Sequence, residues 1–268
     1  MPAIQPARLK IQAEALAQKA NSPGEFLRAL HELLERYADR TYRPGKGGSL
    51  APLLPSYHVP QPVLTQILSA LQPFVASDLA AVLALCDVLW VDQNYESRLL
   101  AVYLLGEVSV DPPELVLDRF ASWARPGTDN RLLDLLIERG LSRMRQEQRE
   151  RYLEEAAARL KSDNVFFQQL GLKCLEQLVG MQEFEDYPGV TRLLEPLLRT
   201  GSTLLRPDML RLVRALGRKS PKETGFFLRQ NLVHKANNLN TAWLIRHSLA
   251  DYPAETQEYL RAGLRERN

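Results

Sequence analysis

Trp123 and Asp129 are the two residues whose types and spacing could support chemistry at one site. They stand in the stretch SWARPGTDNRLLD, separated by a turn built around Pro126 and Gly127. A carboxylate can stabilise positive charge that develops in a reaction, and an aromatic ring can face a substrate. The same residues also suit a structural role, because aspartate is a preferred N-cap and Asp129 opens a helical pattern. The sequence leaves both interpretations open: a catalytic pair, or a loop that ends in a good helix cap.

Basic side chains are concentrated in one part of the chain. Between residues 192 and 246, eleven lysines and arginines stand against three acidic residues, an excess of +8 that leaves −6 for the remainder. The eleven are Arg192, Arg199, Arg206, Arg211, Arg214, Arg218, Lys219, Lys222, Arg229, Lys235 and Arg246. Because the overall net charge is only +2, this local excess carries more information than the total.

Five of these cations are the strongest candidates for binding nucleic acid. Arg211, Arg214 and Arg218 are spaced by three and four residues, so they share one helix face. With Lys219 and Lys222 they predict a positive surface that binds the phosphates of double-stranded DNA. A solvated basic face, or a face that binds an acidic protein, is the alternative.

The elements that must position these residues are helices. Apolar residues recur at helical spacing almost throughout the chain, and sustained strand alternation is missing. About fourteen helices of 12 to 16 residues, paired every ~35 to 40 residues, match the size of HEAT repeats. We therefore expect an all-α, HEAT-like α-solenoid of about six to seven antiparallel helix pairs, forming a single domain over residues 1–268. Cys86 and Cys174 fall in apolar helical runs and are expected to be buried core thiols.

One segment interrupts the helical pattern. Residues 40–56, RTYRPGKGGSLAPLLPS, are rich in Gly, Pro and Ser and form a long loop. Lys46 and Ser49 suggest a phosphate-binding loop, but the GxxxxGK[ST] spacing is missing and no strand precedes it. We expect a flexible basic loop that brings Lys46 toward DNA, or a plain linker.

Several functional classes are disfavoured. His31, His58, His234 and His247 lack metal-ligand spacing, and no nucleotide-binding or nucleophile motif occurs, so we expect neither metal nor cofactor. The first residues lack the apolar core of a signal peptide, no stretch is apolar enough for a membrane helix, and the two cysteines form no framework. These features predict a cytoplasmic protein without membrane contact, which we expect to be a monomer.

Four stretches resemble a known family. The chain is similar to the bacterial DNA alkylation repair proteins built from HEAT-like repeats, the AlkD-like alkylpurine DNA glycosylases, from about residue 55 to 250. The stretches that carry the resemblance are SYHVPQPVLTQIL (56–68), LWVDQNYESRLLAVYLL (89–105), KSDNVFFQQLGLKCL (161–175) and ALGRKSPKETGFFLRQN (215–231).

The resemblance implies a C-shaped solenoid that holds damaged or distorted duplex DNA in a basic groove. Members of the family excise N3- and N7-alkylated purines without extruding the base into a pocket. The alkylated purine is cationic and already a good leaving group, so the enzyme needs a carboxylate to stabilise the oxocarbenium-like sugar or to place a water, and aromatic faces against the deoxyribose. By resemblance, Asp129 is the candidate carboxylate and Trp123 the candidate aromatic wall, although six positions separate them here where the family has four.

Two departures from the family pattern leave the enzymatic activity open. Gln169 occupies the position of a functional arginine, and a neutral amide cannot replace a guanidinium that clamps phosphate. Gln169 therefore enters the set of candidate DNA-contacting residues as a neutral donor. Arg211 falls where the family has a second aromatic residue, and Trp243 could supply one unless it belongs to the core. The sequence predicts a DNA-binding repair protein that either retains glycosylase activity or acts as a non-enzymatic scaffold for distorted DNA or an acidic protein.

Overall fold

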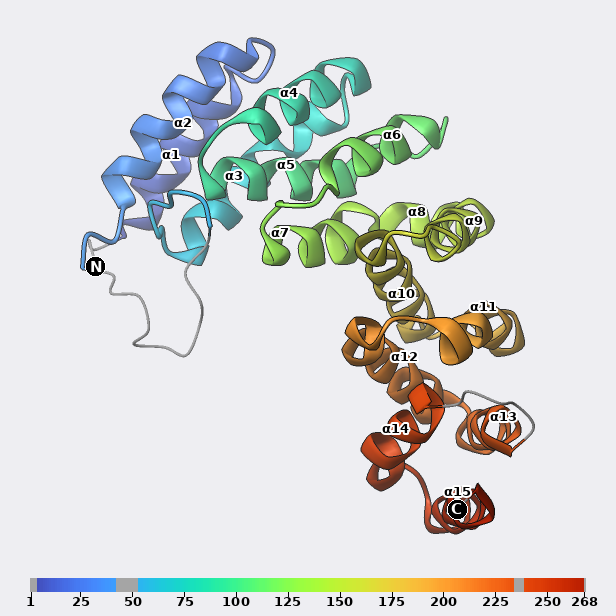
Figure 1. Ribbon diagram of the computed structural model, residues 1–268. Coiled ribbons are helices and arrows are strands. Elements are labelled where there is room, and N and C mark those ends of the chain that lie inside the picture. The colour runs from blue at the N-terminus through green and yellow to red at the C-terminus, as the bar shows by residue number, and fades with distance from the viewer. Residues whose placement is uncertain (1–3, 42–52, 234–238, 268) are drawn as a thin grey trace. The chain divides into compact units, whose positions relative to one another are not determined.

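The computed structural model describes residues 4–41, 53–233 and 239–267 (Figure 1). All regular elements in these ranges are helical, which confirms the all-α prediction. Fifteen α-helices, one π-helix and two 3₁₀-helices are present there, close to the fourteen helices expected. Contacts divide the chain into two compact units, Met1–Gln148 and Arg149–Asn268, which are described one at a time. The expected single domain and its C-shape stay predictions.

The N-terminal unit stacks its helices in two layers (Figure 1). Helices α1, α3, α5 and α7 follow one another in the first layer, and α2, α4 and α6 form the second. Arg119 of α6 forms an ion pair with Asp87 of α4, with 2.6 Å between Nη2 and Oδ2. The bounds are α1 (Pro6–Ala17), α2 (Pro23–Tyr37), α3 (Gln61–Val75), α4 (Leu79–Val91), α5 (Tyr95–Glu107), α6 (Glu114–Trp123), α7 (Asn130–Leu135) and α8 (Ser142–Glu147).

The C-terminal unit repeats this arrangement. Helices α10, α12 and α14 pack in sequence as one layer, and the second layer contains α9, α11, α13 and α15 (Figure 1). Two 3₁₀-helices, Thr203–Leu205 and Leu249–Asp251, precede α12 and follow α14. The bounds are α9 (Arg149–Leu160), α10 (Val165–Gly180), α11 (Tyr187–Thr200), α12 (Arg206–Lys219), α13 (Pro221–Val233), α14 (Leu239–Ser248) and α15 (Ala254–Arg267).

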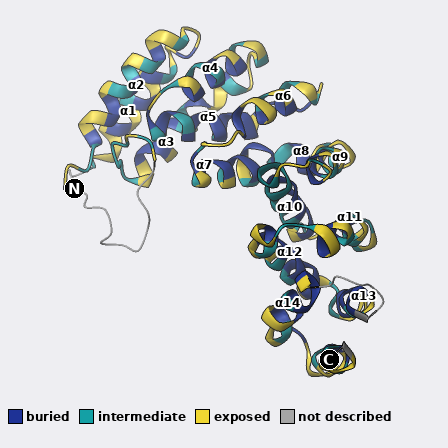
Figure 2. Ribbon diagram, in the orientation of Figure 1, coloured by how far each residue is buried: buried dark blue, intermediate teal, exposed yellow. Residues whose placement is uncertain are grey.

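Each unit buries the apolar stripes of its helices between its own two layers. Figure 2 shows buried residues on the facing sides of the helices and exposed residues on their outer sides. Cys86 and Cys174 are both buried, as the sequence predicts, and burial raises the pKa of the Cys86 thiol. Stacked amphipathic helix pairs of this kind are the building principle of α-solenoids.

A π-helix interrupts the helical pattern that Asp129 opens. Residues Leu136–Gly140 adopt π geometry between α7 and α8. The carbonyls of Ile137 and Glu138 accept hydrogen bonds from the buried Arg145 guanidinium, at 3.1 and 3.2 Å. Wider helical turns of this kind shift the positions that follow, and helical periodicity in the sequence does not reveal them.

The π-helix lies very close to α5 at Gly106. A Cβ atom placed on Gly106 would lie only 2.3 Å from the carbonyl oxygen of Arg139. Real atoms do not approach so closely, so the two backbones can meet at this distance only when residue 106 has no side chain.

We expect Gly106→Ala to lower the free energy of unfolding by about 1–3 kcal/mol, because the added methyl group forces α5 and the π-helix apart. Urea denaturation checks this value. Gly24→Ala in α2 is the matched control, since nothing lies within 4 Å of its added methyl group. The control should leave stability unchanged or raise it by up to about 1 kcal/mol. Equal losses for both variants would contradict the close approach.

Candidate functional site

Asp129 is the N-cap of α7, as the sequence predicts. Its Oδ1 accepts a hydrogen bond from the backbone N–H of Arg131 at 2.8 Å. Its Oδ2 accepts a second bond, also 2.8 Å long, from the backbone N–H of Leu53. Only 6% of the residue is exposed. Both oxygens therefore have backbone donors, and the carboxylate joins α7 to a segment 76 positions away in the chain.

That segment, residues 53–58, contains no regular element and is called the strap here, because its hydrogen bonds attach it to two helices of the N-terminal unit. The carbonyl of Pro55 accepts hydrogen bonds from the backbone N–H of Tyr95 and the side-chain amide of Asn94, at 2.9 and 3.2 Å. Asn94 also caps α5 with its side-chain oxygen. Burial, together with the charge of Asp129, raises the pKa of Tyr95. The strap thus lies over the N-terminal ends of α5 and α7.

Glu96 is the second carboxylate that holds the strap, and no motif in the sequence marks it as a site residue. Only 3% of Glu96 is exposed, and its two oxygens accept from the Ser56 hydroxyl at 2.7 Å and the Tyr57 backbone N–H at 3.2 Å. His58 follows with a positive φ of 52°, a backbone conformation that non-glycine residues rarely adopt. The backbone N–H of His58 donates to the Ser56 hydroxyl oxygen at 3.0 Å, so the hydroxyl group that donates to Glu96 also holds this turn.

We expect Glu96→Gln to lower the free energy of unfolding by about 1–3 kcal/mol. A glutamine presents one donor where the carboxylate accepted two bonds, so a buried N–H or O–H of the strap loses its acceptor. Urea denaturation measures the loss. The exposed carboxylate of Glu107, at the other end of α5, provides the comparison, and Glu107→Gln should change stability by less than about 0.5 kcal/mol. A Glu96→Gln protein as stable as the parent would argue against the strap contacts.

Trp123 lies in the core rather than on an open surface. Its ring stacks on Trp90 of α4, with centroids 4.5 Å apart and planes at 7°, and the guanidinium of Arg98 lies over Trp90, 5.5 Å from the centroid. Trp123 is 4% exposed and Trp90 is 9% exposed. The backbone carbonyl of Trp123 accepts from the Thr128 hydroxyl at 3.0 Å, which fixes the turn before α7. The stack therefore positions the turn that carries Asp129.

The other carboxylate of α7 is exposed. Asp134 stands five residues after Asp129 on the same helix, and it faces solvent while Asp129 is buried. No motif in the sequence distinguishes Asp134, because it stands between apolar residues in NRLLDLL. Helix α7 thus has a buried carboxylate at its N-cap, Asp129, and an exposed carboxylate within the helix, Asp134.

In the C-terminal unit, the predicted cations of α12 lie along one stripe of the helix, where Arg214 is partly buried and the others are exposed, but most of them have partners. Arg211 donates to Glu176 of α10 at 3.1 Å and to Asp208 one turn away. Arg214 donates to Asp251 at 2.8 Å. These ion pairs connect α12 to α10 and to the 3₁₀-helix that follows α14. The polar side chains on the surface of this layer are therefore bonded to one another from helix to helix.

The remaining predicted cations differ in how they are held. Lys219 donates to the Met181 carbonyl at 3.1 Å, and Lys222 pairs with Glu255 at 3.2 Å. Arg218 is exposed and makes no hydrogen bond or ion pair within residues 4–41, 53–233 and 239–267. It is therefore the member of the predicted set most available to an external phosphate.

Several acidic partners of these cations lie outside the 192–246 window. Glu176, Asp251, Glu255 and Glu266 each pair with a basic residue inside it. Over the whole C-terminal unit, nineteen lysines and arginines stand against fifteen acidic residues, a net charge of +4. The basic character predicted from sequence is present in this unit, but at half the magnitude that the window indicated.

Gln169 and Lys46 are the remaining residues that the sequence predicts to contact DNA. Gln169 is partly exposed on α10, where it shares a face with Glu176, seven residues later. The structure thus brings Gln169 into the same layer as Arg211 through the Glu176–Arg211 pair. Lys46 and most of the 40–56 loop lie outside the described residues.

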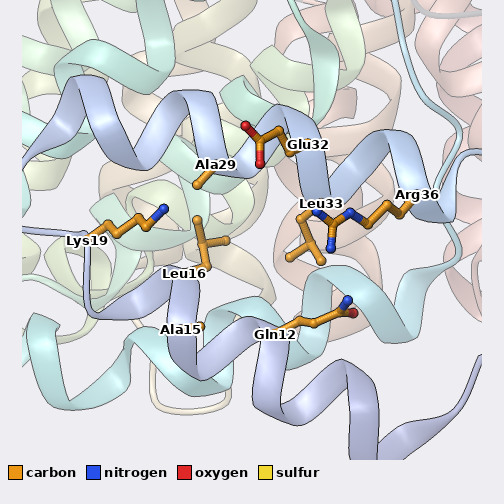
Figure 3. Close-up of a pocket in the computed structure, with 8 residues that line it drawn as sticks. All are labelled: Gln12, Ala15, Leu16, Lys19, Ala29, Glu32, Leu33 and Arg36. Atoms are coloured by element: carbon orange, nitrogen blue, oxygen red, sulfur yellow. The ribbon is translucent and has the colours of Figure 1, made fainter.

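Two surface grooves contain none of the candidate catalytic residues. One of about 160 Å³ lies between α1 and α2, where Lys19 and Arg36 stand at its two ends above Leu16 and Leu33 (Figure 3). Another, of about 420 Å³, lies between α11 and α13 and is lined by residues that include Phe226. Neither groove joins a carboxylate of α7 to an aromatic face.

Paired helices in two layers within each unit define an all-α protein. A sequence model of the DNA alkylation repair enzyme family matches residues 30–251, and the chain belongs to that family. Comparison with curated proteins and with solved structures gives no match.

Within the described part of the chain, no helix combines the length and apolar character needed to span a bilayer.

Proposed function

We propose that this protein binds duplex DNA containing N3- or N7-alkylated purines and hydrolyses the N-glycosidic bond of the damaged base. The observation that carries the proposal is the family match over residues 30–251, which indicates a role in DNA alkylation repair. The exposed cations on α12 support binding of phosphates. The carboxylates at the N-cap of α7 and within it support cleavage of the N-glycosidic bond, because a carboxylate can stabilise the positive charge on the sugar.

Cleavage of this glycosidic bond requires few catalytic groups from the protein. An alkylated purine carries a positive charge and leaves as a neutral base, so no general acid is required. Positive charge passes to the deoxyribose as the glycosidic bond breaks, and a fixed carboxylate stabilises that charge or orients the attacking water.

Asp129 is the carboxylate that we assign to this role. Its two backbone donors hold it in place without reorganisation, which is the arrangement that favours electrostatic stabilisation. Trp123 is buried and acts as a positioning residue that supports the turn before Asp129. Access of a sugar to Oδ2 requires that the strap residue Leu53 give up its hydrogen bond to that oxygen.

The direct test is release of base from duplex DNA containing N7-methylguanine, measured by chromatography of the free base. Enzyme-dependent release above the spontaneous rate supports the proposal. Release that does not depend on the protein, at concentrations that saturate the DNA, would contradict glycosylase activity.

A non-enzymatic scaffold for distorted DNA is the second candidate function. It is favoured by Gln169, which replaces a phosphate-clamping arginine with a neutral amide, and by the buried state of Asp129. Tight, salt-dependent binding of alkylated DNA without release of the base would establish this function instead. Absence of any DNA binding would instead favour an acidic protein as the partner of the basic face.

A further inference from the structure

Trp243 of α14 is built into a stack of three flat side chains. The ring of His247, one helical turn later, lies 3.9 Å from the Trp243 ring between centroids, with planes inclined by 21°. The guanidinium of Arg206 lies over Trp243, 5.5 Å from the centroid. Arg206 also donates to Asn240 at 2.9 Å, which holds the guanidinium in place. Arg206 and Trp243 are partly buried whereas His247 is exposed, so His247 is the outermost member of the stack.

The His247 ring is held in place. Its Nδ1 lies 2.8 Å from the Trp243 carbonyl oxygen, which can only accept, so Nδ1 is the donor. The His247 carbonyl in turn accepts from Arg214 of α12 at 3.0 Å, and Arg214 is fixed by Asp251. His247 is nevertheless exposed, so a fixed aromatic ring faces solvent.

The position of this stack separates it from the other aromatic residues. Trp90 and Trp123 are buried against each other in the N-terminal unit, whereas Trp243 is only partly buried. Arg246 stands beside it on the same stripe of α14, is exposed, and forms no ion pair or hydrogen bond with any described residue. An aromatic platform next to an available cation matches the two chemical parts of a nucleotide, a flat base and a phosphate.

We propose that Trp243 and His247 form a stacking platform for a nucleobase that has left the duplex, with Arg246 binding its phosphate. The inference rests on the proposed DNA binding and adds a specificity to it. In a continuous duplex both faces of every base are covered by its neighbours, so the platform selects DNA in which one base is unstacked. Phosphate contacts alone give no such selection, because they are equivalent in paired and distorted DNA.

The test compares two 20-base-pair duplexes at the same salt concentration, one fully paired and one with a single bulged adenine. Stacking of a base on an aromatic side chain is expected to make the bulged duplex bind about 5- to 150-fold more tightly. His247→Ala and Trp243→Leu should each remove most of this preference, while affinity for the paired duplex changes less than about twofold. Tryptophan emission should change on addition of the bulged duplex, since Trp243 is the accessible tryptophan.

Phe226→Ala is the matched control. It removes an aromatic side chain that is 58% exposed on α13, in the other layer of the same unit, and it should leave the preference unchanged. Equal affinity of the parent protein for the two duplexes would overturn the platform while leaving the proposed DNA binding intact. Retention of the preference in both His247→Ala and Trp243→Leu would also overturn it. Failure to bind either duplex at ~50 mM salt would instead remove the proposed function on which the platform rests.

Discussion

Asp129→Asn should reduce the rate of N7-methylguanine release by about 10²–10³-fold, the loss typical of removing one preorganised electrostatic group from a reaction centre. The substitution removes the negative charge that would stabilise the developing oxocarbenium ion. Binding of the DNA should not weaken, because a carboxylate repels phosphate and its removal takes away no attractive contact. Single-turnover release of the base, with the protein in excess over DNA, measures the effect without interference from product dissociation.

The stability of the same variant separates chemistry from folding. Asparagine is as good an N-cap as aspartate, so the bond from Arg131 can persist. The asparagine amide has only one oxygen, so its NH₂ group takes the place of the oxygen that accepts from the Leu53 N–H. Loss of this hydrogen bond should lower the free energy of unfolding by about 1–3 kcal/mol. The folded fraction should therefore be checked by circular dichroism at the assay temperature.

Asp134→Asn is the matched control for the chemistry. It removes the same charge from the same helix at an exposed position, and it should leave base release within about twofold of the parent, since surface substitutions outside a site have small effects. The opposite pattern, with Asp134→Asn inactive and Asp129→Asn active, would move the reaction to the exposed carboxylate and reduce Asp129 to a helix cap.

The triple variant Arg214→Ala, Arg218→Ala, Arg246→Ala should bind duplex DNA about a hundredfold or more weakly at ~0.1 M salt. Each lost phosphate contact reduces the slope of log K against log salt by about 0.9, so three contacts account for about 2.7 in the slope. Affinity measured by fluorescence anisotropy at several salt concentrations gives both quantities.

The control for net charge uses three exposed arginines from the other layer of the same unit. Arg192, Arg261 and Arg265 lie on α11 and α15, in the second layer, and their replacement by alanine changes the net charge by the same amount. This variant should retain a salt slope close to that of the parent. Similar losses in the two triple variants would show that affinity follows overall charge rather than the α10–α12–α14 layer.

The fold could be predicted from local sequence, because amphipathic periodicity and helix caps act over a few residues. The Asp129 cap is one example. The π-helix at Leu136–Gly140 could not be predicted this way, since helical periodicity does not mark a wider turn, and its close approach to Gly106 joins positions that are distant in sequence. The position of the strap could not be predicted either, because its contacts to Glu96 and Asp129 join residues that are 39 to 76 positions apart in the sequence.

The charge of the candidate interface shows a similar limit. A window of sequence counts cations and anions that are neighbours along the chain, whereas ion pairs form between neighbours in space. Glu176 and Asp251 lie outside the basic window and still pair with Arg211 and Arg214. The location of the basic face was therefore predicted, but the identity of its available cations, Arg218 and Arg246, required the structure.

The most direct measurement is the affinity of the unmodified protein for duplex DNA, with and without N7-methylguanine, across a salt series from ~50 to ~200 mM. A linear fall of log K with log salt, with a slope that corresponds to several phosphate contacts at about −0.9 each, is the predicted result. No binding at ~50 mM salt, where such contacts are strongest, would contradict the assignment of the C-terminal unit as a nucleic-acid interface.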